Sequence, residues 1–372
     1  MIVPFFDFKA APASLKQEWK DAVERVIESG RFIGGPEVSE FEKKWANYLG
    51  IEYAIGVANG LDAITLGLRA LNIGPGAKVA VPSHTFLATW LSVEAVGATP
   101  VGIDCDENGL MDLEALESHL ESFQAVIPVH MHGQMVDMPR LSKWASEKNV
   151  KVIEDCAQAH GAKIQGRFAG TWGDIGAFSF YPTKNLGALG DAGIVVTKDA
   201  TLATLVRSFG NYGSVPESKY KYARIGMNSR LDPLQAAFLG VNLQYLDMWT
   251  MRRREIAEKL ISALGAKKLG LLVDDANESV WHHFIVLPKD RDQAKKELEE
   301  KGIFTDIHYP ECAADSYQSI TGIPTNESPK ARNLAKHTLS LPISPWMTDE
   351  QVQYVIDAFN DRSVLRYFLE DK

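Results

Sequence analysis

A lysine and an aspartate, 29 residues apart, each follow a short apolar run. Asp155 comes directly after Val150–Glu154, and Lys184 follows Gly176–Phe180 in a stretch rich in glycine. A lysine amine can form an imine with an aldehyde, and a carboxylate can keep a pyridine nitrogen protonated so that the ring accepts electrons. Taken singly, such an aspartate more often caps a segment, and such a lysine is more often a solvated charge. Together they indicate pyridoxal phosphate chemistry.

A third element could bind the phosphate of such a cofactor. In the segment Asn59-Gly60-Leu61-Asp62-Ala63, an apolar run gives way to a predicted helix. The first amides of a helix have no partner within it and form the positive end of its dipole, which suits a phosphate group. The spacing is not that of a Walker loop, and no G-x-G-x-x-G occurs. Strand–glycine–helix turns are common, so this motif supports the other two residues without standing alone.

These residues lie where short apolar runs alternate with longer amphipathic ones. Helices are predicted at Leu61–Leu71 and Phe86–Val96 from apolar residues at helical spacing. Strands are predicted at Tyr53–Val57, Lys78–Pro82, Thr99–Ile103, Ala125–His130, Val150–Glu154, Gly176–Phe180 and Ile194–Thr197. Alternating strands and helices predict an α/β fold, with a mostly parallel seven-stranded sheet and helices on both faces. In such sheets, ligands bind at the carboxyl ends of the strands.

The pattern changes near Asp232, where a long helical region begins. A strand at Trp281–Leu287 and further helices follow it. We therefore predict a large α/β domain over residues 1–240 and a smaller α+β domain over residues 241–372. About the first 30 residues are expected to pack alongside the small domain.

Bulk properties exclude several classes of protein. The 372 residues carry a formal net charge of −9 with mixed signs, which argues against a nucleic-acid partner. The three cysteines are far apart, so neither a disulfide framework nor a zinc site is expected. The N-terminal residues do not have the pattern of a signal peptide, so we expect none, and no run is long enough to span a bilayer. We expect a cytoplasmic protein.

The chemistry-bearing segments also resemble a known family. Glu154-Asp155-Cys156-Ala157-Gln158-Ala159-His160-Gly161, followed by Ser179–Gly193, is similar to the nucleotide-sugar aminotransferases of the DegT–StrS group, which have the fold-type I aminotransferase fold. The likeness extends from Phe32 to at least Tyr309. Within the group, the segments around Gly60, Thr85–Trp90 and Asn185–Asp191 look closest to enzymes that aminate dTDP-3-keto-6-deoxyhexoses at C3.

The resemblance implies a role for each matching residue. Lys184 would bond to the cofactor and move protons, and Asp155 would pair with the pyridine nitrogen. The remaining cofactor-binding residues would be Gly60, Leu61, Phe86, Gln158, Ser179 and, from a second subunit, Asn228. The expected substrate contacts are Tyr181, His308, Tyr309 and the partner's Lys219. A homodimer with shared active sites follows. L-glutamate would be the amino donor, with pyridoxamine phosphate as the intermediate form of the cofactor.

Two departures from the family pattern lie near the expected sugar side. His132 stands where relatives usually have an aromatic residue, and the stretch after Tyr309 lacks a second proline and a histidine that are common there. His130 and His132, at strand spacing, would share one face, but a metal site needs a third ligand and only His160 is a candidate. We expect no metal. His282 and His283 are expected on opposite faces of a strand.

Three other functions remain open. One is amination at C4 of a UDP-linked keto sugar. Another is cofactor-dependent sugar dehydration, which Lys184 disfavours because enzymes of that kind replace this lysine. The third is a regulatory protein that binds the cofactor without catalysis.

Overall fold

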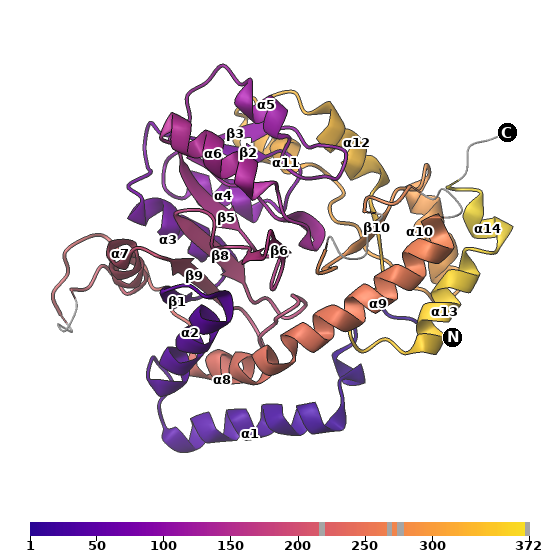
Figure 1. The fold of residues 1–372 in the computed structure, drawn as a ribbon, viewed down its shortest axis with the longest axis horizontal. Coiled ribbons are helices and arrows are strands. Elements are labelled where there is room, and N and C mark those ends of the chain that lie inside the picture. Colours follow the sequence, from indigo (N-terminus) through magenta and orange to yellow (C-terminus); the bar gives the residue numbers. More distant parts are fainter. Residues whose placement is uncertain (216–219, 266–269, 274–278, 369–372) are drawn as a thin grey trace.

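A seven-stranded sheet is the centre of the computed structural model, which describes residues 1–215, 220–265, 270–273 and 279–368. Its strands are β1 (Tyr53–Val57), β2 (Lys78–Pro82), β3 (Thr99–Ile103), β4 (Ala125–Val126), β5 (Lys151–Asp155), β8 (Ile175–Ser179) and β9 (Gly193–Thr197). The order across the sheet is β1-β9-β8-β5-β4-β2-β3 (Figure 1). β9 runs antiparallel to both neighbours, and the other pairs are parallel. The predicted fold class is confirmed.

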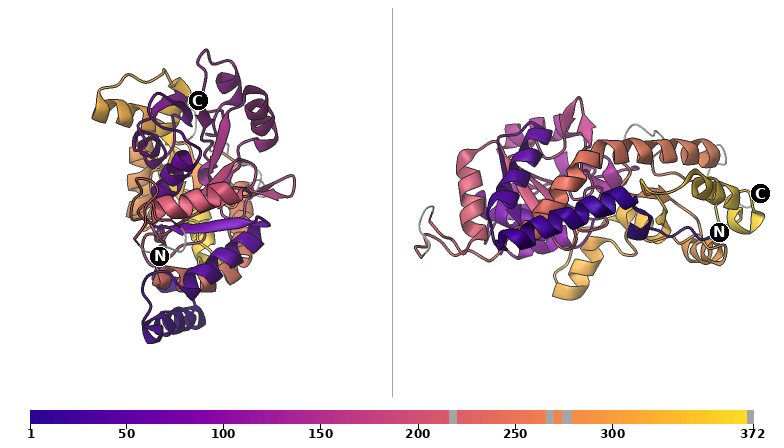
Figure 2. Two further views of the ribbon diagram at one scale, coloured as in Figure 1. Left: turned by 90° about the vertical axis from the view of Figure 1, so that its left-hand side faces the viewer. Right: turned by 90° about the horizontal axis from the view of Figure 1, so that it is seen from below.

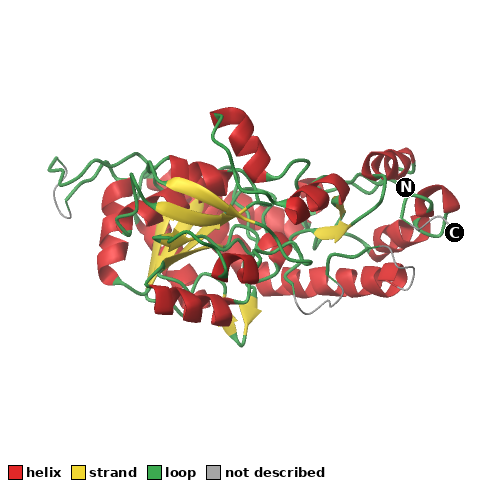
Figure 3. Cartoon of the chain, turned by 90° about the horizontal axis from the view of Figure 1, so that it is seen from above, coloured by secondary structure: helices red, strands yellow, loops and turns green. Residues whose placement is uncertain are grey.

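Helices cover both faces of this sheet, because successive residues of each strand point to opposite sides. In β9, Val195 packs in a core with α3, α4 and α7, whereas Ile194 and Val196 pack in a core with α2 and α8. The same alternation in β5 sends Ile153 to the first face and Val152 toward α6. The result is a three-layer arrangement, seen with the sheet between helices in Figure 3.

The helices range from four to twenty residues. They are α1 (Ala13–Ser29), α2 (Pro36–Leu49), α3 (Gly60–Ala70), α4 (Ala88–Glu94), α5 (Leu113–Glu117), α6 (Met138–Lys148), α7 (Ala200–Gly210), α8 (Pro233–Asn242), α9 (Leu246–Gly265), α10 (Arg291–Glu300), α11 (Ala313–Thr321), α12 (Pro329–His337), α13 (Asp349–Ala358) and α14 (Arg362–Leu365). Short 3₁₀ turns lie at Phe8–Ala10, Met131–Gly133 and Leu243–Tyr245. No helix in the described part of the chain is long and apolar enough to cross a membrane.

A separate core lies at the far end of α9 (Figure 2). It contains α10, α13 and the two-stranded sheet of β10 (Phe284–Val286) and β11 (Leu339–Leu341). The N-terminal segment joins it, because Val3 is fully buried there and pairs with Ile303. Helix α1, in contrast, packs along α8. The division into domains at residue 240 stays a prediction.

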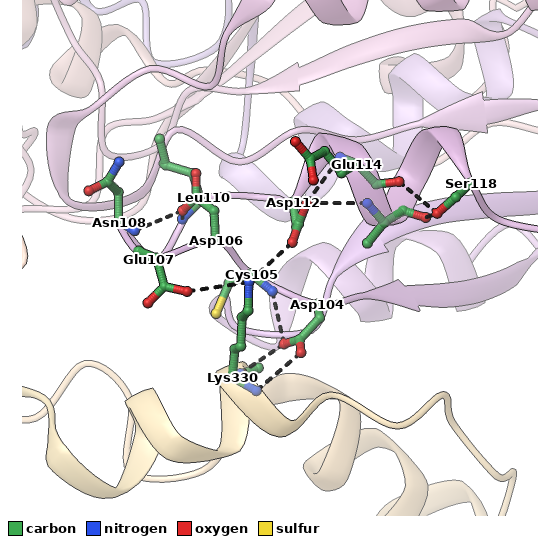
Figure 4. A network of polar contacts seen from close by, with 12 residues as sticks. Asp104, Cys105, Asp106, Glu107, Asn108, Leu110, Asp112, Glu114, Ser118 and Lys330 are labelled. Atoms are coloured by element: carbon green, nitrogen blue, oxygen red, sulfur yellow. Dashed lines mark hydrogen bonds and ion pairs between the residues drawn. The ribbon is translucent and has the colours of Figure 1, made fainter.

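Helix α12 is anchored to the sheet part of the molecule. The Asp104 carboxylate accepts hydrogen bonds from the amides of Lys330 (3.1 Å) and Ala331 (2.8 Å) in the first turn of α12. A carboxylate at this position satisfies unpaired amides and the positive end of the helix dipole. The Lys330 ammonium lies 3.4 Å from both Glu107 and Asp112, so an acidic loop surrounds this lysine (Figure 4).

Two expected strands are shorter than predicted, and one pair of histidines was placed wrongly. β4 ends at Val126, because Pro128 has no amide proton to continue the ladder. β10 begins only at Phe284, since Trp281 has a positive φ of 52° that interrupts the extended backbone. His282 and His283 therefore do not alternate across a strand. Their ring centroids are 3.9 Å apart.

Two hairpin strands, β6 (Lys163–Ile164) and β7 (Arg167–Phe168), project from the sheet part between β5 and β8. They follow the Asp155 segment and return the chain to the sheet. The strands β5 and β8 thus pair directly, and their carboxyl ends lie at the same edge. This edge carries the candidate site.

Candidate active site

Asp155 is the last residue of β5, and its carboxylate is buried in the protein. One carboxylate oxygen, Oδ2, accepts a hydrogen bond from the Thr89 hydroxyl at 2.9 Å, and the other accepts one from the Ala157 amide at 3.1 Å. Burial raises the pKa of Asp155, while these two donors and the nearby Lys184 ammonium oppose the rise. A buried carboxylate held in this way suits a cationic N–H group such as a protonated pyridine.

Lys184 lies close enough to Asp155 for their charges to interact, as the sequence suggested. It lies in the loop after β8, where its amide donates to the Tyr181 carbonyl at 2.9 Å. Burial lowers the pKa of Lys184 to about 8, and the Asp155 charge opposes this shift. The neutral amine, which is the nucleophile, is thus far more abundant at neutral pH than in an ordinary lysine.

The start of α3 and the end of β8 form a tight cradle. Asn59 caps α3 by accepting a hydrogen bond from the Asp62 amide at 2.8 Å, so the amides of Gly60 and Leu61 lie in the first, internally unpaired turn. A Cβ added at Gly60 would lie 2.6 Å from Ser179 Cβ. Only glycine lets the helix start approach the serine this closely. The cradle offers amides and a hydroxyl, the donor set that a phosphate requires.

Gln158 and Tyr309 form a second wall. The side-chain oxygen of Gln158 accepts a hydrogen bond from the His132 amide at 2.6 Å, which orients its Nε2 toward the Tyr309 hydroxyl at 3.0 Å. The Tyr309 ring is 5.6 Å from that of Phe86, centroid to centroid. Phe86 is 59% exposed, so its ring face is free to stack on a planar ligand.

The other predicted residues differ in how the structure places them. His308 precedes Tyr309, with ring centroids 5.5 Å apart. The Tyr181 side chain is exposed, and its amide donates to the Ser179 hydroxyl at 3.3 Å. Asn228 is exposed in a bridge to Asn211. Lys219 lies outside the described residues.

Sequence reasoning missed one residue with a direct part in this arrangement. Thr89 lies on α4, and its hydroxyl is the only side-chain donor to Asp155 among the residues that the structure describes. The signal was a threonine three residues after Phe86, in a mostly apolar helix. Because a buried hydroxyl is usually hydrogen-bonded, such a residue indicates a polar partner inside the protein.

The histidines weighed as metal ligands do not form one group. His132 has a positive φ of 61° in a 3₁₀ turn, so it does not share a strand face with His130. His160 Nε2 donates to the Ser179 carbonyl, 2.9 Å away. His130 instead lies with Glu154 and Cys156, whose possible ligand atoms are within 4.8 Å of one another.

Hydrogen bonds account for this last cluster. The Glu154 carboxylate accepts from the amides of Gly170 (2.9 Å), Trp172 (2.6 Å) and Gly173 (2.8 Å), and its Oε2 lies 3.1 Å from His130 Nε2. Four partners use the acceptor capacity of a carboxylate. Glu154 thus fixes the loop that follows β7, next to Asp155, and serves the site as a structural residue.

A lysine with a lowered pKa near a buried carboxylate, and a cradle of helix amides and a serine hydroxyl at the same sheet edge, are features of an enzyme with the fold-type I aminotransferase fold. The chain belongs to the DegT/DnrJ/EryC1/StrS aminotransferase family, whose profile matches residues 13–360.

Two relatives are equally similar to this chain. One is the dTDP-3-amino-3,4,6-trideoxy-alpha-D-glucose transaminase of Streptomyces venezuelae, 43% identical over 96% of each chain. The other is the dTDP-3-amino-3,6-dideoxy-alpha-D-galactopyranose transaminase of Aneurinibacillus thermoaerophilus, also 43% identical, over 96% of this chain and 99% of that one. The crystal structure of S. venezuelae DesV in complex with a ketimine intermediate superposes with a TM-score of 0.93 at 41% identity, over the full length of both chains.

Proposed function

We propose that this protein is a pyridoxal-phosphate-dependent aminotransferase that moves an amino group from L-glutamate to C3 of a dTDP-linked 3-keto-6-deoxyhexose. The observation that carries the proposal is that Lys184 lies near the buried Asp155 at the edge that also holds the Gly60–Ser179 cradle. The names of the two relatives at 43% identity support the nucleotide and the position of the amino group. The product would be a 3-amino-3,6-dideoxy sugar for a polysaccharide or a glycosylated metabolite.

Each residue has a task in that reaction. Pyridoxal phosphate, when bound, supplies an electron-accepting ring for the carbon that gains or loses the amine. Asp155 would hold the proton on the ring nitrogen, and Thr89 would keep this carboxylate in place. Lys184 would hold the cofactor through Nζ and then, once released, carry a proton between carbon atoms. Because the pKa of Lys184 is lowered to about 8, Nζ can accept that proton near neutral pH.

The wall residues would orient the ring and the sugar. Gln158 Nε2 points to the same region as the Tyr309 hydroxyl and would donate to the ring oxygen. Phe86 would stack on the ring. Tyr181, His308, Tyr309 and a partner's Lys219 would contact the sugar or the diphosphate.

We also propose a homodimer in which Asn228 of one subunit binds the phosphate held by the other. Asn228 is exposed on the chain itself, as a residue that reaches a second subunit must be. Mixing two inactive variants, Lys184→Ala and Asn228→Ala, tests this sharing. A mixed dimer has one site with both residues intact, so subunit exchange should restore up to about a quarter of the activity. Mass spectrometry would show whether mixed dimers have formed. If they have formed and no activity returns, the shared site is refuted.

The central experiment follows the cofactor and the sugar separately. Purified protein with pyridoxal phosphate should absorb in the visible range as a lysine adduct, and L-glutamate should bleach that band. Lys184→Ala should lose both properties, and a variant that still turned over would refute the mechanism.

We also propose that the protein works in a reducing cytoplasm. Its three cysteines are free and buried, which supports this location.

Substrate choice is decided by a panel of keto sugars. Incubation with dTDP-3-keto and UDP-4-keto sugars plus glutamate, with NMR to locate the new C–N bond, distinguishes amination at C3 from amination at C4. A protein that binds the cofactor but exchanges no amino group with any amino acid would instead be regulatory.

A further inference from the structure

The histidine that departs from the family pattern has a specific partner. His132 Nδ1 lies 3.2 Å from His283 Nδ1, and both side chains are buried. Since two imidazole nitrogens can hydrogen-bond only if one carries the proton and the other does not, each ring fixes the tautomer of the other. The contact joins the loop after β4 to the segment before β10.

The backbone around His132 is held as firmly as its ring. The His132 carbonyl accepts hydrogen bonds from the His282 amide at 3.0 Å and the Ser279 hydroxyl at 3.3 Å. Its amide donates to Gln158, as described above. The positive φ of 61° is therefore fixed from both sides. His132 is a rigid support for His283.

His283 in turn lies flat against His308. Their ring centroids are 3.8 Å apart and the ring planes differ by 14°. Both histidines lie just outside the paired residues of this sheet: His283 directly precedes Phe284, which pairs with Leu341, and His308 follows Asp306, which pairs with Ser340, by two residues. Stacking fixes the plane of the His308 ring. The orientation of the ring within that plane is fixed by Ser340, whose hydroxyl is 2.8 Å from His308 Nδ1.

His308 lies near the site, since it contacts Tyr309 and the charge of Lys184 acts on it. Nδ1 is engaged by Ser340, so Nε2 is the ring nitrogen left for a ligand, and it lies 3.7 Å from Asp306 Oδ2. The side chain is 16% exposed, whereas His283 is buried. Phe5, from the N-terminal segment, also lies against His308, with ring centroids 5.7 Å apart.

From this geometry we infer that His283, held by His132, is a positioning residue for His308 and thereby for the sugar nucleotide. The inference rests on the proposed function, in which His308 contacts that substrate. His283 touches neither the cofactor-binding residues Asp155 and Lys184 nor the phosphate cradle through any described hydrogen bond. Its loss should consequently affect the sugar half of the reaction and leave the glutamate half unchanged.

The test compares His283→Ala with His283→Phe, which keeps a stacking ring. Aromatic stacking energies correspond to a change of about three- to tenfold in an equilibrium constant, so the alanine variant should raise KM for the sugar nucleotide by that factor. The phenylalanine variant should stay within about twofold of the original protein. Bleaching by glutamate, followed by absorbance, should be equal in all variants. His119→Ala, whose described hydrogen bonds go to Glu121 and Asn326, is the matched control.

A double-mutant cycle with His308→Ala shows whether His283 acts through His308. The effect of His283→Ala should vanish when His308 is already alanine. An additive effect, equal losses in the alanine and phenylalanine variants, or an unchanged KM in His283→Ala would each overturn the inference. If His283→Ala does not fold, His283→Leu fills the space without a stacking ring and replaces it. Failure of the original protein to react with glutamate would refute the proposed function instead.

Discussion

The phosphate cradle can be tested by a single added methyl group, with Gly60→Ala. The new Cβ would lie 2.6 Å from Ser179 Cβ and 3.2 Å from Ser179 Cα, about 1 Å inside ordinary contact distance. The backbone of residue 60 is helical, so alanine fits its conformation and the whole effect comes from the clash. Overpacking of this kind costs about 1–3 kcal/mol. Because β8 and α3 form the two walls of the cradle, we expect their separation to weaken phosphate binding.

The expected change is a Kd for the cofactor raised about 5- to 150-fold, since about 1.4 kcal/mol corresponds to a factor of ten. Pyridoxamine phosphate is the suitable probe, because it cannot bond covalently to Lys184 and its binding is an equilibrium. Gly240→Ala on α8 is the matched control, as a Cβ there meets no atom within 4 Å. It should leave Kd unchanged and raise the free energy of unfolding by up to about 1 kcal/mol through helix propensity.

Unchanged cofactor affinity in Gly60→Ala, with the control also unchanged, would refute the placement of the phosphate. A second variant separates the clash from the loss of a donor. Ser179→Gly removes the Cβ that the new methyl group would approach to 2.6 Å, so the double variant should be more stable than the sum of the two single effects predicts. Affinity should stay low in the double variant, because the serine hydroxyl is gone.

Three further predictions concern the charged groups. Asp155→Asn should slow the glutamate half-reaction by about 10²- to 10⁴-fold, measured in single turnover, because an amide cannot hold the ring nitrogen protonated. Thr89→Val removes a donor that lowers the pKa of Asp155, so the carboxylate should become protonated at a higher pH. As the pH is lowered, the half-reaction of this variant should therefore slow at a higher pH than that of the original protein, measured as a pH profile. The rate at which pyridoxal phosphate bonds to Lys184 should rise with pH and level off above about pH 8, since the charged amine predominates below the pKa and the neutral amine above it. A midpoint of this pH profile near the pKa of a free lysine would contradict the argument that burial lowers the pKa of Lys184.

The sheet could be predicted closely because its strands are uninterrupted apolar runs. The predicted bounds of β1, β2 and β3 agree with the structure, since polar residues or turns flank each run. The failures share one cause, a backbone feature inside an apolar run. Pro128 ended β4 early, and the positive φ of Trp281 shifted the start of β10. Side-chain pattern alone does not reveal a change in backbone conformation within such a run.

The meeting of the candidate cofactor residues at one sheet edge was predictable for a related reason. Gly60, Asp155 and Ser179 lie at the ends of elements that the pattern delimits, and parallel strands bring those ends to one edge. Thr89 was missed because its partner comes from a different strand 66 residues away. The stack of His283 on His308 joins two segments 25 residues apart that do not pair with each other, and no local pattern encodes such a contact.

This contrast bears on which sugar the protein uses. The two relatives at 43% identity carry names of products that differ at C4, where one is deoxygenated and the other is not. Overall identity therefore does not separate these substrates, and the cofactor residues, which serve every amino transfer, cannot separate them either. Any discrimination must come from groups that contact the sugar. In the arrangement proposed above, one of those groups, His308, stacks on His283, which His132 holds from a segment 151 residues away in the sequence. We therefore expect a change at His132 or His283 to alter substrate preference while leaving the cofactor chemistry intact.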